Sequence, residues 1–373
     1  MIKLILSFVV VMLSLRGYSE PLISLSGSVL SGSSLYDQST YKSFNGQFDT
    51  AANLDVDVEF SKNVSVMTEL NFGGAENMTG FSDGVTLGGI LVTIIPSNEI
   101  SLIGERYTHI LLGNNTIPFG QFAEDQTNNA SLSSQFMFND LGYAFLSNGS
   151  NVNSFSATGA GLSLQVGPKA HFAEDDISNV DIMVFNGVNN LDSNEDQGFG
   201  VALRVKTPEL PSQTVVGMSY LAANELRKPD THTRANIRAV MMDASTSVAS
   251  FDFGGYLLVG HFNDGDSLTK DTATILMGQV SRNINRLTFA GRYSIYRPEH
   301  YTGNGGGSRA FPENVGFATL TSGDVEITRV QLSAMLELEK DVRFHNEILF
   351  DTYGENREQY NTVGFLSYVS VDF

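Results

Sequence analysis

The stretch NLDVDVEFSKNVSVMTELNF (residues 53–72) has the pattern of two β-strands joined by a short turn. Apolar and polar residues alternate in each half, and Ser61, Lys62 and Asn63 separate the halves. Because successive side chains of a strand point to opposite faces, each half has one apolar and one polar face. The alternation and the turn together predict an antiparallel β-hairpin.

The same period of two recurs through the chain. In EITRVQLSAMLELEK (326–340), for example, Val330, Leu332 and Leu336 fall on one face and Arg329 on the other. A surface helix is the alternative for this stretch, but its unbroken alternation favours a strand. We expect about sixteen such strands in all. Their ranges are near 22–32, 47–60, 63–73, 84–95, 99–112, 155–166, 179–189, 198–207, 212–223, 234–244, 249–262, 272–282, 285–297, 324–338, 341–353 and 362–373.

The connections between these segments alternate in length. Short ones such as Pro96–Asn98 and Asn283–Asn285 alternate with long polar ones such as 224–233 and 298–323. This layout is typical of an all-β transmembrane antiparallel β-barrel, with short periplasmic turns and long extracellular loops. A secreted β-sandwich or β-helix is the alternative, but the chain has no fixed repeat, and a sandwich would not alternate its loop lengths so regularly.

The C-terminal stretch FLSYVSVDF (365–373) continues the alternation to the last residue. Because a barrel in lipid can leave no strand edge unpaired, this last strand must pair with the first. Such a terminus resembles the C-terminal recognition strand of bacterial outer-membrane proteins, which the barrel-assembly machinery reads. The resemblance implies an assembly signal at Phe365, Tyr368, Val371 and Phe373 and that machinery as a partner.

The N-terminal stretch MIKLILSFVVVMLSLRGYSE (1–20) has the pattern of a secretory signal. Lys3 precedes about twelve apolar residues, and the small-residue run Gly17–Ser19 follows. A membrane anchor is the alternative, but the apolar run is too short to cross about 30 Å of hydrocarbon. We therefore expect a signal peptide at 1–19 and a single transmembrane barrel at 20–373.

Composition narrows the classes of function. The chain has no cysteine, which excludes disulfides and thiolate metal sites. Its net charge of −19, from 22 basic and 41 acidic residues, argues against nucleic acid as a partner. The mean hydropathy is −0.05, and after the N-terminal stretch no apolar run approaches the roughly eighteen residues that a membrane helix needs. The expected surroundings are outer-membrane lipid and lipopolysaccharide.

An enzyme is not expected. The six histidines are scattered, and none belongs to a metal-ligand pair such as HxH or HExxH. The chain has neither a Gly-x-Ser-x-Gly motif nor a Gly-rich phosphate loop. The acidic stretches LDSNEDQG (191–198) and HFNDGDS (261–267) lack the full spacing of a calcium loop. We predict no catalytic residue, no metal site and no cofactor.

Charges on the polar faces divide along the sequence. A barrel of about sixteen strands encloses a water-filled channel, whose wall these residues would line. Acidic residues come from the early strands and basic residues from the later ones, so that two walls would face each other and screen solutes by charge. Local ion pairs, such as Arg343 with Glu337 across one turn, are the alternative. The predicted pore-lining charges are Asp55, Asp57, Glu59, Glu69, Arg204, Arg238, Arg292, Arg329 and Arg343.

The longest connection, 113–154, contains NNTIPFGQFAEDQTNNASLSSQFMFNDLGYAFLSNGSN (114–151). It has seven Phe, Tyr or Met residues and no Lys or Arg, so it is apolar enough to fold into the lumen and narrow it. An ordinary surface loop is the alternative. The residues of this candidate constriction loop are Pro118, Phe119, Gly120, Glu124, Asp125 and Asp140.

The segment LLGNNTIPFGQF (111–122) resembles the Gly-x-x-x-x-Pro-Phe-Gly segment of the phosphate-selective porin O/P-like group and related siderophore-porin-type porins. FMFNDLGYAF (136–145) and MVFNGVNNLDSNEDQGFGVALRV (183–205) also resemble stretches of that group. The resemblance implies a sixteen-stranded, homotrimeric porin through which small hydrophilic solutes or ions diffuse.

Phosphate selectivity would need a constriction rich in lysine and arginine, and the loop has neither. We therefore expect a mild cation preference or tolerance of neutral solutes. The alternative function is an outer-membrane receptor or adhesin whose long loops bind a ligand or a surface.

Overall fold

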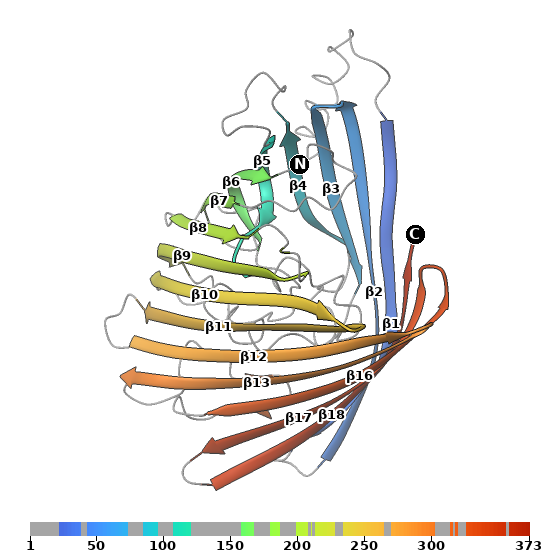
Figure 1. Cartoon of the computed structure of the whole chain (residues 1–373), viewed down its shortest axis with the longest axis vertical. Helices are drawn as coiled ribbons and strands as arrows, with labels where there is room; N and C mark the ends of the chain where they lie inside the picture. The colour runs from blue at the N-terminus through green and yellow to red at the C-terminus, as the bar shows by residue number, and fades with distance from the viewer. Residues whose placement is uncertain are drawn as a thin grey trace.

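In the computed structural model, sixteen antiparallel strands close into one barrel (Figure 1). Among the described residues no helix is long and apolar enough to cross a membrane. The structure describes residues 22–38, 43–73, 85–95, 107–120, 158–167, 180–186, 199–207, 210, 213–227, 234–264, 270–302, 314–315, 318–319, 326–355 and 358–373. The expected signal peptide therefore lies outside the described residues.

Most strands lie within a few residues of the expected segments, but β5 is Tyr107–Thr116 where the segment 99–112 was expected. Several strands are longer than expected, such as β1, which reaches Gln38. A short separate sheet pairs β14 (Asn314–Val315) with β15 (Ala318–Thr319). The barrel strands are β1 (Leu22–Gln38), β2 (Ser43–Ser61), β3 (Val64–Gly73), β4 (Val85–Ile94), β5 (Tyr107–Thr116), β6 (Thr158–Gly167), β7 (Val180–Asn186), β8 (Phe199–Lys206), β9 (Val215–Arg227), β10 (Arg234–Val248), β11 (Phe251–Asp264), β12 (Lys270–Ile284), β13 (Leu287–Thr302), β16 (Ile327–Glu339), β17 (Val342–Glu355) and β18 (Glu358–Asp372).

Strands that follow each other in the sequence are neighbours in the barrel wall. The colours of Figure 1 therefore run in order around the wall, and β13 pairs with β16. The last strand, β18, pairs with β1 from Ser28↔Asp372 to Tyr36↔Gly364. The predicted number of strands and the predicted closure of the barrel are both confirmed.

Two-residue turns join alternate strand pairs at one end of the barrel, which we call the turn end. They lie at Lys62–Asn63, Ala249–Ser250, Asn285–Arg286 and Lys340–Asp341. The other end, where the long connections lie, is the loop end. Turns of this kind need positive backbone φ, which Asn285 (57°) and Asp341 (66°) adopt more readily than most residues.

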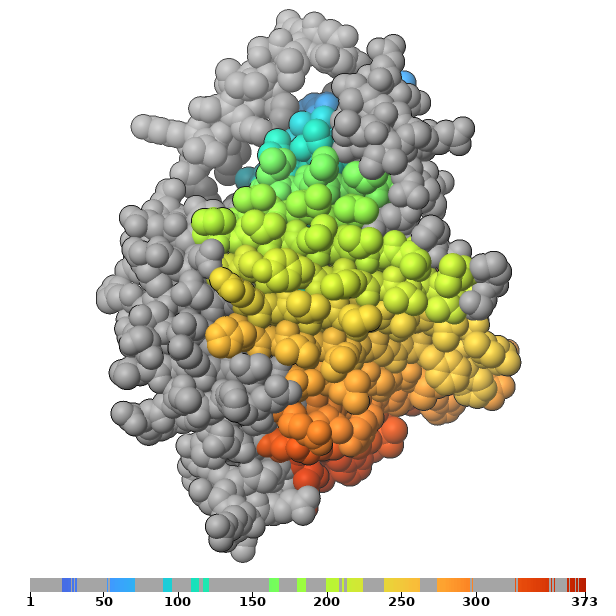
Figure 2. Space-filling view, turned by 60° about the vertical axis from the view of Figure 1, so that its left-hand side comes forward, coloured from blue at the N-terminus to red at the C-terminus, as the bar shows by residue number. Residues whose placement is uncertain are grey.

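The outer surface of the barrel is apolar and exposed. On β12, Leu276 is 50 % exposed, whereas its neighbours Ile275 and Met277, which point inward, are 0 % and 2 % exposed. Figure 2 shows the continuous outer surface that the side chains of β8 to β13 form. Exposed apolar side chains on every second residue of neighbouring strands are characteristic of a wall that faces lipid.

The alternation of β18 agrees with the sequence pattern. Val363 and Phe365 point outward and are 40 % and 37 % exposed, and Phe373 is 62 % exposed. Tyr368 is opposite Gly32 in the register with β1. The role of these residues as an assembly signal stays a prediction.

Candidate pore and its lining

The first residues of the long connection lie inside the barrel. Ile117 and Phe119 are 1 % and 3 % exposed, and Pro118 and Gly120 are buried too. The backbone N–H of Gly120 donates a hydrogen bond of 3.0 Å to Ser219 Oγ, on the inner face of β9. The predicted inward path is thus present for residues 117–120. Glu124, Asp125 and Asp140 lie outside the described residues.

Gly120 is required by the local geometry. Its φ of +86° lies in the left-handed region, which favours glycine. A Cβ atom at this position would collide with the sulfur of Met241 on β10. The Pro-Phe-Gly motif therefore brings the backbone of the connection into direct contact with the barrel wall.

The wall around this contact is apolar, although it faces the lumen. We call the apolar inward-facing residues of β9 to β12, which surround the polar Ser219 and Asp243, the apolar sector. They are almost fully buried, at 5 % exposure or less. Its members are Leu221, Ala223, Ala239, Met241, Tyr256, Leu258, Ile275 and Met277.

The carboxylates predicted from the sequence lie on the inner faces of β2 and β3. We call Asp55, Asp57, Glu59 and Glu69 the acidic sector. All four are half-buried, and Asp55 is opposite Glu69 across the two strands. The neighbouring inward position on β1 is the exposed Ser26, opposite Asp55. This part of the lumen wall is polar and accessible to solvent.

The inward-facing arginines are buried, and two of them form hydrogen bonds with other side chains of the barrel wall. Arg204, Arg292 and Arg329 are 1 %, 2 % and 1 % exposed. Arg204 forms two hydrogen bonds with the Asp243 carboxylate, of 2.9 and 3.0 Å. Arg292 donates to Gln279 Oε1 (3.2 and 3.3 Å) and to Gln331 Oε1 (3.3 Å). These arginines lie on the predicted face but present little charge to the lumen.

Two further basic residues depart from the expected roles. Arg343 forms an ion pair of 3.2 Å with Asp372. The alternative of a local ion pair therefore applies to Arg343, but its partner is Asp372 and not the expected Glu337. Arg238 is exposed and alternates with the outward-facing Val240 and Met242 of β10. The prediction that Arg238 lines the pore is wrong, because the register of β10 places it on the outer face toward the loop end.

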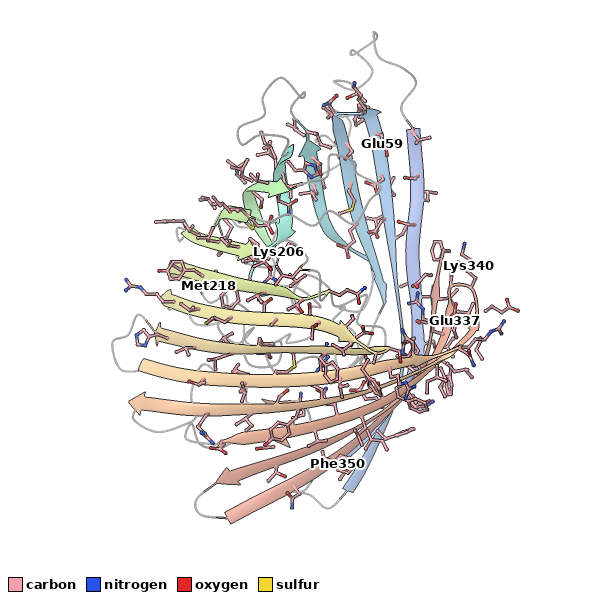
Figure 3. The ribbon with its side chains drawn as sticks, in the orientation of Figure 1. Glu59, Lys206, Met218, Glu337, Lys340 and Phe350 are labelled. Atoms are coloured by element: carbon pink, nitrogen blue, oxygen red, sulfur yellow. The ribbon has the colours of Figure 1, made fainter. Side chains whose placement is uncertain are left out.

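The charged sectors do not face each other as two walls. In the barrel order β10 and β11 lie eight strands from β2 and β3, so the apolar sector is opposite the acidic one. Arg204 on β8 is next to β9 of the apolar sector and five strands from β3. Arg329 on β16 lies two strands from β12 and four from β2. Figure 3 labels Glu59 and Lys206, the charged residues at the turn ends of β2 and β8.

Sequence reasoning missed Ser219 and Asp243, which contact Gly120 and Arg204. Both occupy inward positions among apolar neighbours, Leu221 and Met241. In the sequence, each is a polar residue at an inward-facing position of a strand whose other inward-facing residues are mostly apolar. This signal could be used only once the register of β10 was known. Among the described residues, no group of three or more His, Asp or Glu side chains could hold a metal ion.

Comparison with known proteins gives similarity at the level of structure. No protein-family model matches the sequence, and no curated protein matches it. The barrel is similar to an anion-selective porin from Comamonas acidovorans, with a TM-score of 0.61, 10 % identity, and 95 % of this chain and 100 % of that chain covered.

Two further solved structures are similar over comparable lengths. The trimer form of OmpT, an outer-membrane protein of Vibrio cholerae, gives a TM-score of 0.61 at 8 % identity, covering 95 % of this chain and 100 % of that one. Salmonella typhi OmpF in complex with daunomycin gives 0.59 at 13 % identity, covering 94 % and 97 %. With its lipid-facing outer surface, this chain has the fold of the porin barrels of the bacterial outer membrane.

Proposed function

We propose that this chain is a passive diffusion channel for small hydrophilic solutes or ions, with no chemical step. The observation that carries the proposal is the buried segment 117–120, which lies against one side of the lumen wall. The wall opposite it is polar and partly exposed. An inward-folded loop beside a hydrated wall is the arrangement that a size-selective pore needs.

The charges of the lumen favour cations or neutral solutes over anions. The inward-facing arginines are covered or paired, whereas the carboxylates of the acidic sector are only half-buried. The proposed constriction loop, 113–154, adds the negative charges of Glu124, Asp125 and Asp140. Charges close to the narrowest point act within the screening length of about 8 Å at physiological salt. A mild cation preference is therefore part of the proposal.

Phosphate selectivity is not part of it, because the described lumen offers no open row of basic side chains. A homotrimer is proposed, since one of the similar structures is the trimer form of a Vibrio cholerae outer-membrane protein. Outer-membrane lipid and lipopolysaccharide would surround the barrel, and the barrel-assembly machinery would insert it.

Single-channel recording in planar bilayers tests the proposal. The purified barrel should give stepwise conductance, and a potassium chloride gradient should give a small reversal potential of the sign that denotes cation preference. Strong anion selectivity would contradict the charge argument. A folded barrel that never conducts would overturn the channel and favour a receptor or adhesin.

A further inference from the structure

A buried ion pair crosses one strand of the barrel wall. Arg204 belongs to β8 and Asp243 to β10, with β9 between them. Their side chains are 1 % and 0 % exposed, and Arg204 Nη1 and Nη2 lie 2.9 and 3.0 Å from the two carboxylate oxygens. A paired, two-pronged contact of this kind fixes the orientation of both side chains.

The pair can cross β9 because the inward position between its partners is a glycine. A Cβ atom at Gly217 would lie 2.6 and 2.9 Å from the Asp243 oxygens and 3.0 Å from Arg204 Nη2. Any side chain at position 217 would therefore displace the pair. Gly217 is thus a specific requirement of this contact.

The next inward residue of β9 connects the pair to the long connection. Ser219 Oγ accepts a hydrogen bond of 3.2 Å from Arg204 Nη1 and one of 3.0 Å from the Gly120 N–H. Asp243 therefore fixes Arg204, Arg204 holds the Ser219 hydroxyl, and the hydroxyl holds the backbone at Gly120. Gly120 also lies against Met241, so the segment has a polar and an apolar contact with this wall.

We propose that Arg204, Asp243 and Ser219 form a latch that holds the start of the 113–154 connection against the lumen wall and thereby sets the width of the pore. The inference rests on the proposed function only where it concerns pore width. The latch residues are positioning residues and bind no solute. A role confined to wall stability is the competing explanation.

A thiol reporter separates the two explanations. The chain has no cysteine, so Met241→Cys introduces a single thiol at a site that is 1 % exposed and covered by Gly120. A small water-soluble maleimide should label it slowly in the otherwise unchanged barrel. Adding Gly217→Ala should speed labelling on the order of tenfold, because one lost hydrogen bond shifts an equilibrium by roughly that factor.

Two controls accompany the reporter. Ser26→Cys, on the exposed lumen face of β1, should label quickly with or without Gly217→Ala. Gly278→Ala, on the outer face, adds a methyl group where no atom lies within 4 Å and should leave labelling at position 241 slow. Equally slow labelling in the Gly217→Ala barrel, with its heat-modifiability intact, would overturn the latch.

A second variant avoids crowding the wall. Ser219→Ala removes the shared acceptor, and Ser294→Ala is its matched control, because the buried Ser294 hydroxyl has no hydrogen-bond partner within the described part of the chain. Ser219→Ala should speed labelling at position 241 and weaken discrimination between small and large neutral sugars. Ser294→Ala should change neither.

The labelling and conductance experiments test the latch and the channel proposal separately. If the wild-type barrel never conducts, the channel proposal is wrong, while the labelling rates still decide whether the latch holds the segment. If the barrel conducts but Ser219→Ala and Gly217→Ala leave both labelling and solute discrimination unchanged, the latch alone is wrong.

Discussion

Phe373 and Gly27 exchange two backbone hydrogen bonds, each 3.0 Å between nitrogen and oxygen. The bonds extend the pairing of β18 with β1 beyond the Ser28↔Asp372 pair. The last residue of the chain is therefore part of the sheet that closes the barrel, at its turn end. Since a sheet in lipid cannot leave strand edges unpaired, this contact contributes directly to closure.

Deleting Phe373 should therefore reduce assembly sharply. The deletion removes both hydrogen bonds to Gly27 and an aromatic side chain that is 62 % exposed at the rim. We expect most of the heat-modifiable band to be lost from outer-membrane fractions on semi-native gels. Deletion of Gly306, between β13 and β16 in the sequence, is the control and should assemble normally. A normal yield of folded barrel without Phe373 would refute the assembly role.

Removing residues 121–150 should raise single-channel conductance and weaken discrimination between solutes of different size. The deletion leaves the buried segment 117–120 in place but removes the rest of the proposed constriction loop. A deletion within 303–313, between β13 and β16, serves as the control and should leave conductance unchanged. Unchanged conductance in an intact 121–150 deletion would mean that the loop does not narrow the lumen.

Much of the fold was predictable because lipid imposes a strict period of two on each strand. Val363 and Phe365 are exposed on the outer face, and Arg329 and Gln331 are buried on the inner face, as the alternation predicted. The turn at Ala249–Ser250 was not predicted correctly. Both residues have positive φ (50° and 67°) without being glycine, asparagine or aspartate, so only Ser250 marks the turn, and serine occurs in strands as well.

The pore lining was harder to predict. A period of two shows which residues share a face of a strand, but not which side chains of other strands they contact. Arg292 was assigned to the lumen, where it lies, but its hydrogen bonds to Gln279 and Gln331 depend on the register of three strands. Arg238 was misassigned because the outer face tolerates charge away from the membrane centre. Contacts between distant strands therefore needed the structure.

Leu276→Arg should destabilise the barrel by about 2–4 kcal/mol, the usual effect of a charge on the lipid face near the bilayer centre. Leu276 is 50 % exposed and lies near the middle of β12. Ile284→Arg, on the same face at the turn end of that strand and 45 % exposed, is the matched control and should cost about 1 kcal/mol or less. Urea unfolding in phospholipid vesicles measures both, and equal costs would contradict a lipid-facing β12.

Ion selectivity should be controlled by carboxylates, because the basic groups of the lumen are covered. Replacing Asp55, Asp57 and Glu69 with their amides removes three half-buried negative charges from the acidic sector. The reversal potential in a potassium chloride gradient should move toward anions. Glu326→Gln, at an exposed residue paired with Arg297 near the loop end, is the control and should have little effect.

The constriction loop provides the second arm of this measurement. Amide replacements of Glu124, Asp125 and Asp140 should shift the reversal potential further than those of the acidic sector, because charges at the narrowest point act in a focused field. The shift should also shrink as salt rises and the screening length falls. A wild-type pore that is already strongly anion-selective would contradict both arms. It would mean that Arg292 and Arg329 are open to the conducting path.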